Sequence, residues 1–159
     1  MAVPLSARVL AAAWAGALAA IAFLAAPNAF ATLATADAGR YVARLFTLEA
    51  WTSLVLALLL LFAEQRRARA AAAQGADSGA QAAGSVMSGA TLLLLGALFC
   101  TVAGHFGIEP MMAAARAGQG PWSFAALHVA STVLYAVKGV LVIVLAWRWA
   151  RAAGPGVPG

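Results

Sequence analysis

Residues 122–147 read WSFAALHVASTVLYAVKGVLVIVLAW, an almost unbroken apolar run of 26 residues. An α-helix of this length crosses the ~30 Å hydrocarbon layer of a bilayer. His128, Tyr135 and Lys138 interrupt the run with titratable side chains. Titratable groups inside a membrane span usually mark a functional part of the protein. This stretch therefore predicts a transmembrane helix whose titratable side chains are candidates for a functional role.

The composition extends the same prediction to the whole chain. Of its 159 residues, 64% are hydrophobic and 9% are charged, and the mean hydropathy is +0.90. A soluble domain is about 45–50% apolar and about 25% charged. The predicted fold class is an all-α integral membrane four-helix bundle, a single domain over residues 1–151. Its predicted spans are residues 9–30, 46–63, 86–108 and 122–147.

The segments between the spans are predicted to be irregular. Residues 31–45 are polar enough to form a loop, with one or two helical turns on the membrane surface. Residues 70–85 are small and polar, which is typical of a flexible connector, and the Gly/Pro tail at 152–159 is predicted to be disordered. Pro110 is predicted to end the third helix.

The first apolar run also imitates a secretory signal, because Ala29 and Ala31 form an A-x-A site. Its apolar core, residues 9–26, is 18 residues long, whereas signal cores have about 7–15. We therefore expect a retained span. Ala12, Gly16 and Ala20 make a small-residue ridge on it, as do Gly96, Cys100 and Gly104 on the third span, and such ridges suit close helix packing.

The net charge of +5 comes from arginines at the ends of the apolar runs. Six of them flank the termini and the connector, and three lie on the opposite side. The positive-inside rule then predicts that both termini face the cytoplasm of a bacterial inner membrane, with the arginines contacting lipid headgroups. The sequence has no basic stripe with interleaved aromatics, the pattern typical of nucleic-acid binding, so we expect no nucleic-acid partner. The single cysteine, Cys100, has no partner for an internal disulfide.

This topology predicts a polar cluster near the outer surface. Its members lie at span ends that share one side: Asn28, Glu49, His105, Glu109 and His128. One interpretation is that water, headgroups and nearby arginines satisfy these groups. The alternative is a ligand site, with His105 and His128 as ligands of a first-row metal or a haem. No ligand spacing of diagnostic value identifies the metal.

A polar stripe continues inward along the fourth span, through Ser131, Thr132, Tyr135 and Lys138. Lys138 lies 10 residues beyond His128, about 15 Å deeper. No acid is expected at that depth, since Glu49 is predicted near the outer end of its span. The simplest interpretation is a lysine that snorkels toward the cytoplasm. The alternative is that Lys138 lines a polar interior surface with Tyr135 and Thr132.

Four segments carry a family resemblance: AAPNAFATL (25–33), AGRYVARLF (38–46), GIEPMMAAARAG (107–118) and FAALHVASTVLYAVKGVLVIVLAW (124–147). Together they resemble the transmembrane-protein-205-like family, catalogued in bacteria as domain of unknown function number 4149, over residues 10–148. The resemblance implies a four-helix membrane protein with its first span retained. It implies recurring positions at Pro27, Phe30, Arg44, Phe46, Pro110 and His128. It implies no reaction and no catalytic residue.

The sequence predicts no enzyme and no cofactor, because it has no catalytic triad order, HExxH motif or Gly-rich phosphate loop. We expect a structural, accessory or transport-associated membrane protein, with the lipid bilayer and a second copy or another membrane protein as partners. The alternative is a copper-like metal- or haem-handling protein that uses the outer cluster. Its methionines do not form a copper motif, since Met87, Met111 and Met112 are scattered.

Overall fold

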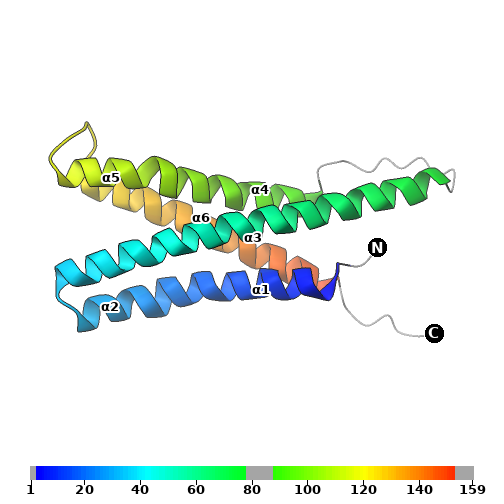
Figure 1. Cartoon of the computed structure of the whole chain (residues 1–159), viewed down its shortest axis with the longest axis horizontal. Coiled ribbons are helices and arrows are strands. Elements are labelled where there is room, and N and C mark those ends of the chain that lie inside the picture. Colours follow the sequence, from blue (N-terminus) through cyan, green and yellow to red (C-terminus); the bar gives the residue numbers. More distant parts are fainter. Residues whose placement is uncertain (1–2, 78–87, 153–159) are drawn as a thin grey trace.

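The computed structural model describes residues 3–77 and 88–152, which form four long helical rods (Figure 1). The elements are α1 (Leu5–Ala20), η1 (Ile21–Ala25), α2 (Ala26–Thr32), α3 (Thr35–Asp77), α4 (Gly89–Thr101), η2 (Val102–Ile108), α5 (Glu109–Arg116) and α6 (Phe124–Arg151). Here η marks a π-helical segment, so that α1–η1–α2 and α4–η2–α5 are continuous helices. All four rods are long and apolar enough to cross a membrane. The predicted all-α, four-span fold is confirmed.

The rods form a four-membered ring. Helix α6 packs along α1 on one side and α4 on the other, while α3 packs against α4 and against α1 and α2. Helices α3 and α6 therefore lie diagonally across the bundle and run in the same direction (Figure 1). Helix α1 begins and α6 ends at the same end of the bundle. Any contact between α3 and α6 must cross the centre of the bundle.

Both prolines inside the rods follow π-helical segments. The N–H of Ala26 bonds to the carbonyl of Ile21 and that of Glu109 to the carbonyl of Gly104, five residues back in each case. Pro27 and Pro110 then lie in the first turn of the next α-helical segment, and a proline has no N–H to donate. The wider turn lets the helix continue through the proline. The prediction that Pro110 ends the third helix is wrong.

Two predicted irregular segments contain helix in the residues that the structure describes. The predicted loop at 31–45 contains a break only near Leu33, whose backbone is extended, and α3 begins at Thr35. Asp37 in the first turn of α3 pairs with Arg40, which favours this early start. Helix α3 also continues through residues 70–77 of the predicted connector. The remainder of the connector (78–85), the first two residues of the predicted third span (86–87) and residues 153–159 of the predicted tail lie outside the described residues.

The core is mainly apolar and lies along the bundle axis. It includes Trp14, Leu60, Leu94, Val142 and Leu145, each at most 2% exposed. The outer surface is apolar as well, with large side chains such as Phe23 exposed. A soluble protein rarely exposes so much contiguous apolar surface. The outside of this bundle therefore suits lipid.

The two small-residue ridges have different surroundings. A Cβ on Gly96 would lie 2.9 Å from Leu141 Cδ1 in α6, whereas one on Gly16 would meet nothing within 4 Å. We predict that Gly96→Leu destabilises the protein by about 1–3 kcal/mol through overpacking. Gly16→Leu, the matched control, should change stability by less than about 0.5 kcal/mol. Thermal unfolding in detergent measures both, and equal losses would contradict the assigned helix contact.

Candidate functional site

An ion pair crosses the centre of the bundle. Lys138 Nζ on α6 donates to both carboxylate oxygens of Glu49 on α3, each at 2.8 Å. Lys138 is 3% exposed and Glu49 is 8% exposed. The expectation of a snorkelling lysine without an acid at its depth is wrong. Of the alternative interpretation, the structure shows Lys138 and Tyr135 in the interior, whereas Thr132 is exposed.

The depth of Glu49 follows from where α3 begins. Glu49 lies 14 residues after Thr35, the first residue of α3, and Lys138 lies 14 residues after Phe124, the first of α6. At 1.5 Å per residue, both are about 21 Å along helices that run in the same direction. The sequence prediction started this span at Phe46 and so placed Glu49 in its first turn. The early start of α3 moves the carboxylate to the level of the lysine.

Further hydrogen bonds join α1 to the pair. The hydroxyl of Ser53, one turn after Glu49, donates to Glu49 Oε1. Trp14 Nε1 on α1 donates to Ser53 Oγ at 2.8 Å. The indole N–H thus orients the hydroxyl, whose own proton points to the carboxylate. This chain of donors, together with the ion pair, ties α1, α3 and α6 at one level.

Tyr135 covers the lysine from the same helix. The Lys138 ammonium lies 4.8 Å from the centroid of the Tyr135 ring, and Phe46 of α3 packs edge-on against that ring at 5.1 Å. The Tyr135 hydroxyl donates to the backbone carbonyl of Leu18 at 3.0 Å, just before η1. The aromatic face supplies a favourable cation–π contact. Tyr135 therefore also links α6 to α1.

Burying either charge alone would cost several kcal/mol, and the Coulomb attraction between them offsets this only when the geometry is good. Here Glu49 accepts from Lys138 and Ser53, and Lys138 has the carboxylate and the Tyr135 ring around it. The network from Trp14 to Lys138 is thus internally satisfied. A buried, satisfied ionic network fixes helix register more readily than it binds a substrate.

Ser53 both accepts and donates in this network, which makes it a direct test. We predict that Ser53→Ala lowers stability by about 1–3 kcal/mol, because it leaves the buried Trp14 N–H without an acceptor. Its neighbour Thr52 is exposed and donates only to the Leu48 carbonyl. Thr52→Ala is the control and should stay within about 0.5 kcal/mol. If the two variants have the same free energy of unfolding in a detergent titration, the network does not contribute to stability.

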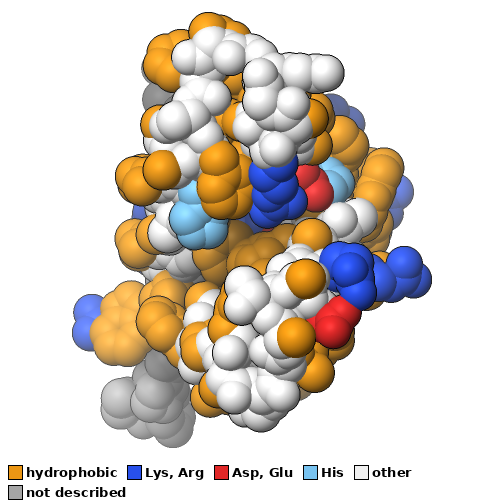
Figure 2. Space-filling view, turned by 90° about the vertical axis from the view of Figure 1, so that its left-hand side faces the viewer, with side chains coloured by type: hydrophobic (Ala, Val, Ile, Leu, Met, Phe, Trp, Pro, Cys, Tyr) orange, Lys and Arg blue, Asp and Glu red, His pale blue; other side chains and the backbone are white. Residues whose placement is uncertain are grey.

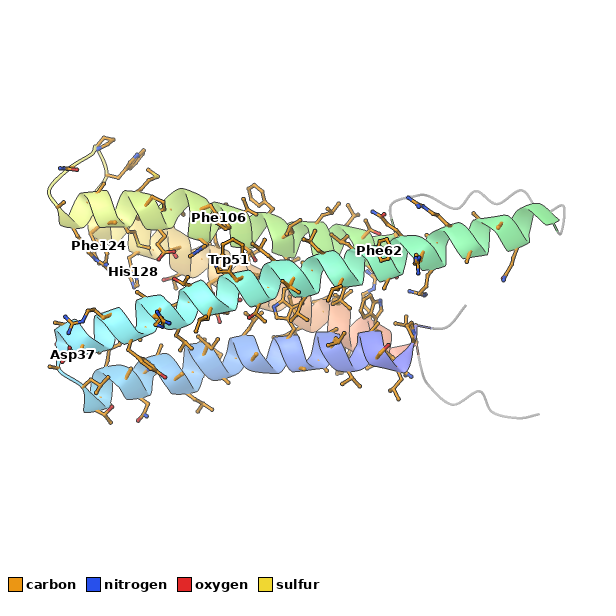
Figure 3. The ribbon with its side chains drawn as sticks, viewed as in Figure 1. Asp37, Trp51, Phe62, Phe106, Phe124 and His128 are labelled. Carbon is orange, nitrogen blue, oxygen red and sulfur yellow. The ribbon has the colours of Figure 1, made fainter. Side chains whose placement is uncertain are left out.

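The predicted outer cluster is only partly assembled. Glu49 belongs to the ion pair, and Asn28 is exposed on α2. His105 Nδ1 contacts a carboxylate oxygen of Glu109 one turn further on. His128 is exposed and stacks on Phe124, with ring centroids 5.8 Å apart (Figure 3). Among residues 3–77 and 88–152, no three His, Cys, Asp or Glu side chains are grouped so that they could hold a metal.

The predicted polar stripe separates into two faces. Tyr135 and Lys138 face the interior, as just described. Thr132 is exposed and donates to the His128 carbonyl, while Ser131 is partly buried. Residues spaced three or four apart share one broad side of a helix. This spacing does not separate side chains that point to the bundle centre from those beside them, so the four residues were predicted as one stripe.

A second polar contact was missed from the sequence. Glu64 on α3 is 8% exposed, pairs with Arg67 and accepts a hydrogen bond from Ser88 Oγ at 2.8 Å. Ser88 is also the N-cap of α4 and accepts from the Thr91 N–H. The serine before an apolar run was the available signal for this cap. The contact holds α3 to α4 near the end of the bundle where α1 begins and α6 ends.

A family model matches most of the chain. The model of domain of unknown function DUF4149 matches residues 9–121. The chain belongs to the DUF4149 family. The DUF4149 match covers the first three rods except residues 5–8 of α1. It includes Trp14, Glu49 and Ser53 and ends before α6 and Lys138. Searches of curated proteins and of solved structures found no match.

Proposed function

We propose that this DUF4149 protein is an accessory membrane protein, a self-contained helical unit that supports another membrane component, including a transport system. The bidentate contact between Lys138 and Glu49 carries the proposal. A transport path needs polar groups that can exchange partners with a passing solute. In this bundle the polar groups of the centre bind one another and are shielded by apolar side chains. This arrangement favours a fixed bundle over a conducting one.

The proposed setting is a bacterial inner membrane with both termini in the cytoplasm. The end of the bundle where α1 begins and α6 ends carries Arg8, Arg66, Arg67, Arg148 and Arg151. Arg66 stacks over the Phe62 ring and Arg151 over the Trp147 ring, at 4.7 and 4.4 Å. Arginine and aromatic side chains of this kind lie at membrane interfaces. Their excess at one end supports the cytoplasmic assignment.

We further propose that lateral contact with a second copy or with another membrane protein completes the accessory role. The ridge of α4 does not serve this purpose at Gly96, which packs against Leu141 inside the bundle. Native mass spectrometry of protein released from a mild detergent would report the number of copies. Among residues 3–77 and 88–152, no group of three His, Cys, Asp or Glu side chains supports the metal-handling alternative.

Proteoliposomes holding the purified chain separate the accessory role from a transport role. We expect proton and potassium fluxes, driven by an imposed membrane potential, to equal those of empty liposomes. The variant Glu49→Gln/Lys138→Met, in which both charges are removed together, serves as the control for any leak. A flux that the wild-type protein supports and this variant abolishes would refute the accessory proposal and make the ion pair part of a conduction path.

A further inference from the structure

A row of charged and aromatic side chains lies at the end of the bundle opposite the start of α1 and the end of α6. The Arg116 guanidinium, in the last turn of α5, lies 4.6 Å from the centroid of the Phe124 ring. His128 stacks on the same ring, with an interplanar angle of 15°. The contact between His105 and Glu109 lies on the adjoining η2 and α5. The loop between Arg116 and Phe124 therefore brings two helix ends into one polar surface.

The view onto this end shows how the row is ordered (Figure 2). The two histidine side chains are separated by a Lys/Arg and an Asp/Glu side chain, in the upper half of the face. Below the row, hydrophobic side chains form the floor of a shallow hollow, and the α2–α3 turn borders it on the other side. The face thus joins a polar row to an apolar hollow.

The charges of this row favour an anion. Glu109 is engaged by His105, whereas Arg116 has no carboxylate partner in the part of the chain that the structure describes. The free N–H groups in the first turn of α6, beside Phe124, add partial positive charge, and Ser123 caps only one of them. Arg116 and His128 from two helices thus offer donors on either side of one aromatic ring. A cationic metal would meet the Arg116 charge here.

We propose that this row binds the phosphate of an anionic phospholipid in the leaflet that faces this end of the bundle. The Arg116 guanidinium holds the phosphate, His128 adds a second donor, and the Phe124 ring fixes both side chains. The hydrophobic hollow receives the first part of an acyl chain, which favours a lipid over a soluble phosphate. This inference is independent of the accessory function, because it rests on side chains at one end of the bundle, with His128 about 15 Å along α6 from Lys138 of the ion pair.

Lipid retention by the whole chain tests the proposal. The protein is purified in detergent with equal amounts of phosphatidylglycerol and phosphatidylcholine, and the lipid that remains bound is counted by native mass spectrometry. Arg116→Gln should reduce bound phosphatidylglycerol about five-fold, as expected for one arginine at a membrane surface. Arg40→Gln is the matched control, because Arg40 is exposed at the same end but already pairs with Asp37. Bound phosphatidylcholine should be unchanged in both variants.

Three outcomes overturn the proposal. Equal loss from Arg116→Gln and Arg40→Gln would mean that surface charge alone retains the lipid. Unchanged retention in Arg116→Gln would place the lipid elsewhere. Displacement of phosphatidylglycerol by millimolar inorganic phosphate would show a site for a soluble anion. Both substitutions lie at exposed positions, so a thermal-unfolding check that both variants remain folded is expected to pass.

Discussion

Lys138→Met should lower the free energy of unfolding by about 3–5 kcal/mol, the range measured when one partner of a buried ion pair is removed. Methionine fills a similar volume, so the loss comes from the charge. Without the ammonium, the Glu49 carboxylate keeps only the Ser53 hydroxyl as a donor in a site that is 8% exposed. Unfolding in mixed micelles, titrated with a denaturing detergent and followed by far-ultraviolet circular dichroism, measures the loss.

The control for this substitution is Arg66→Met. Arg66 is exposed at the membrane interface and contacts the Phe62 ring. Removing this charge should change stability by no more than about 0.5–1 kcal/mol. If Lys138→Met is as mild as Arg66→Met, Lys138 reaches water and does not depend on Glu49.

Trp14→Ala should cost a similar amount, about 3–5 kcal/mol. The Trp14 side chain is 2% exposed and is among the largest fully buried side chains in the described part of the bundle. Its removal leaves a cavity between α1 and α3 and also deprives Ser53 of its donor. The same detergent titration measures this loss.

Trp122 provides the comparison for Trp14. It is 58% exposed, lies just before α6 and has no part in the buried network. Trp122→Ala should stay within about 0.5 kcal/mol of the wild-type protein. Equal destabilisation by the two tryptophan variants would mean that Trp14 faces lipid and that the assigned packing of α1 is incorrect.

Hydropathy was sufficient to predict the four helices but not where they begin. The apolar run marks the part of a helix that fits the hydrocarbon layer, and a helix continues in water or headgroups for as long as its residues allow. Helix α3 begins at Thr35, eleven residues before the predicted span start at Phe46. That difference alone placed Glu49 at the wrong depth. The pairing of Glu49 with Lys138 could not be predicted until the start of α3 was known.

Which side chains meet across the bundle was also beyond the sequence. Glu49 and Ser53 are four residues apart and predictably share a helix face. Their contacts with Lys138 and Trp14 depend on the rotation of three helices about their axes, which weak amphipathicity does not determine when lipid and core are both apolar. The outer cluster was predicted from topology alone: His105 and Glu109 are in contact and His128 lies on the same end face, whereas Glu49 lies deeper, in the ion pair. Topology determines how deep a side chain lies in the membrane, whereas helix packing determines whether it points to the bundle centre or to lipid.

A double-mutant cycle between Glu49 and Lys138 tests the central claim most directly. The stabilities of Glu49→Gln, Lys138→Met and the double variant are compared with that of the wild-type protein. Because the double variant leaves no uncompensated charge in the core, it should recover much of what each single variant loses, with an interaction energy of about 2 kcal/mol or more. If the losses of the two single variants sum to the loss of the double variant within about 0.5 kcal/mol, the two side chains do not interact. That result would contradict the ion pair.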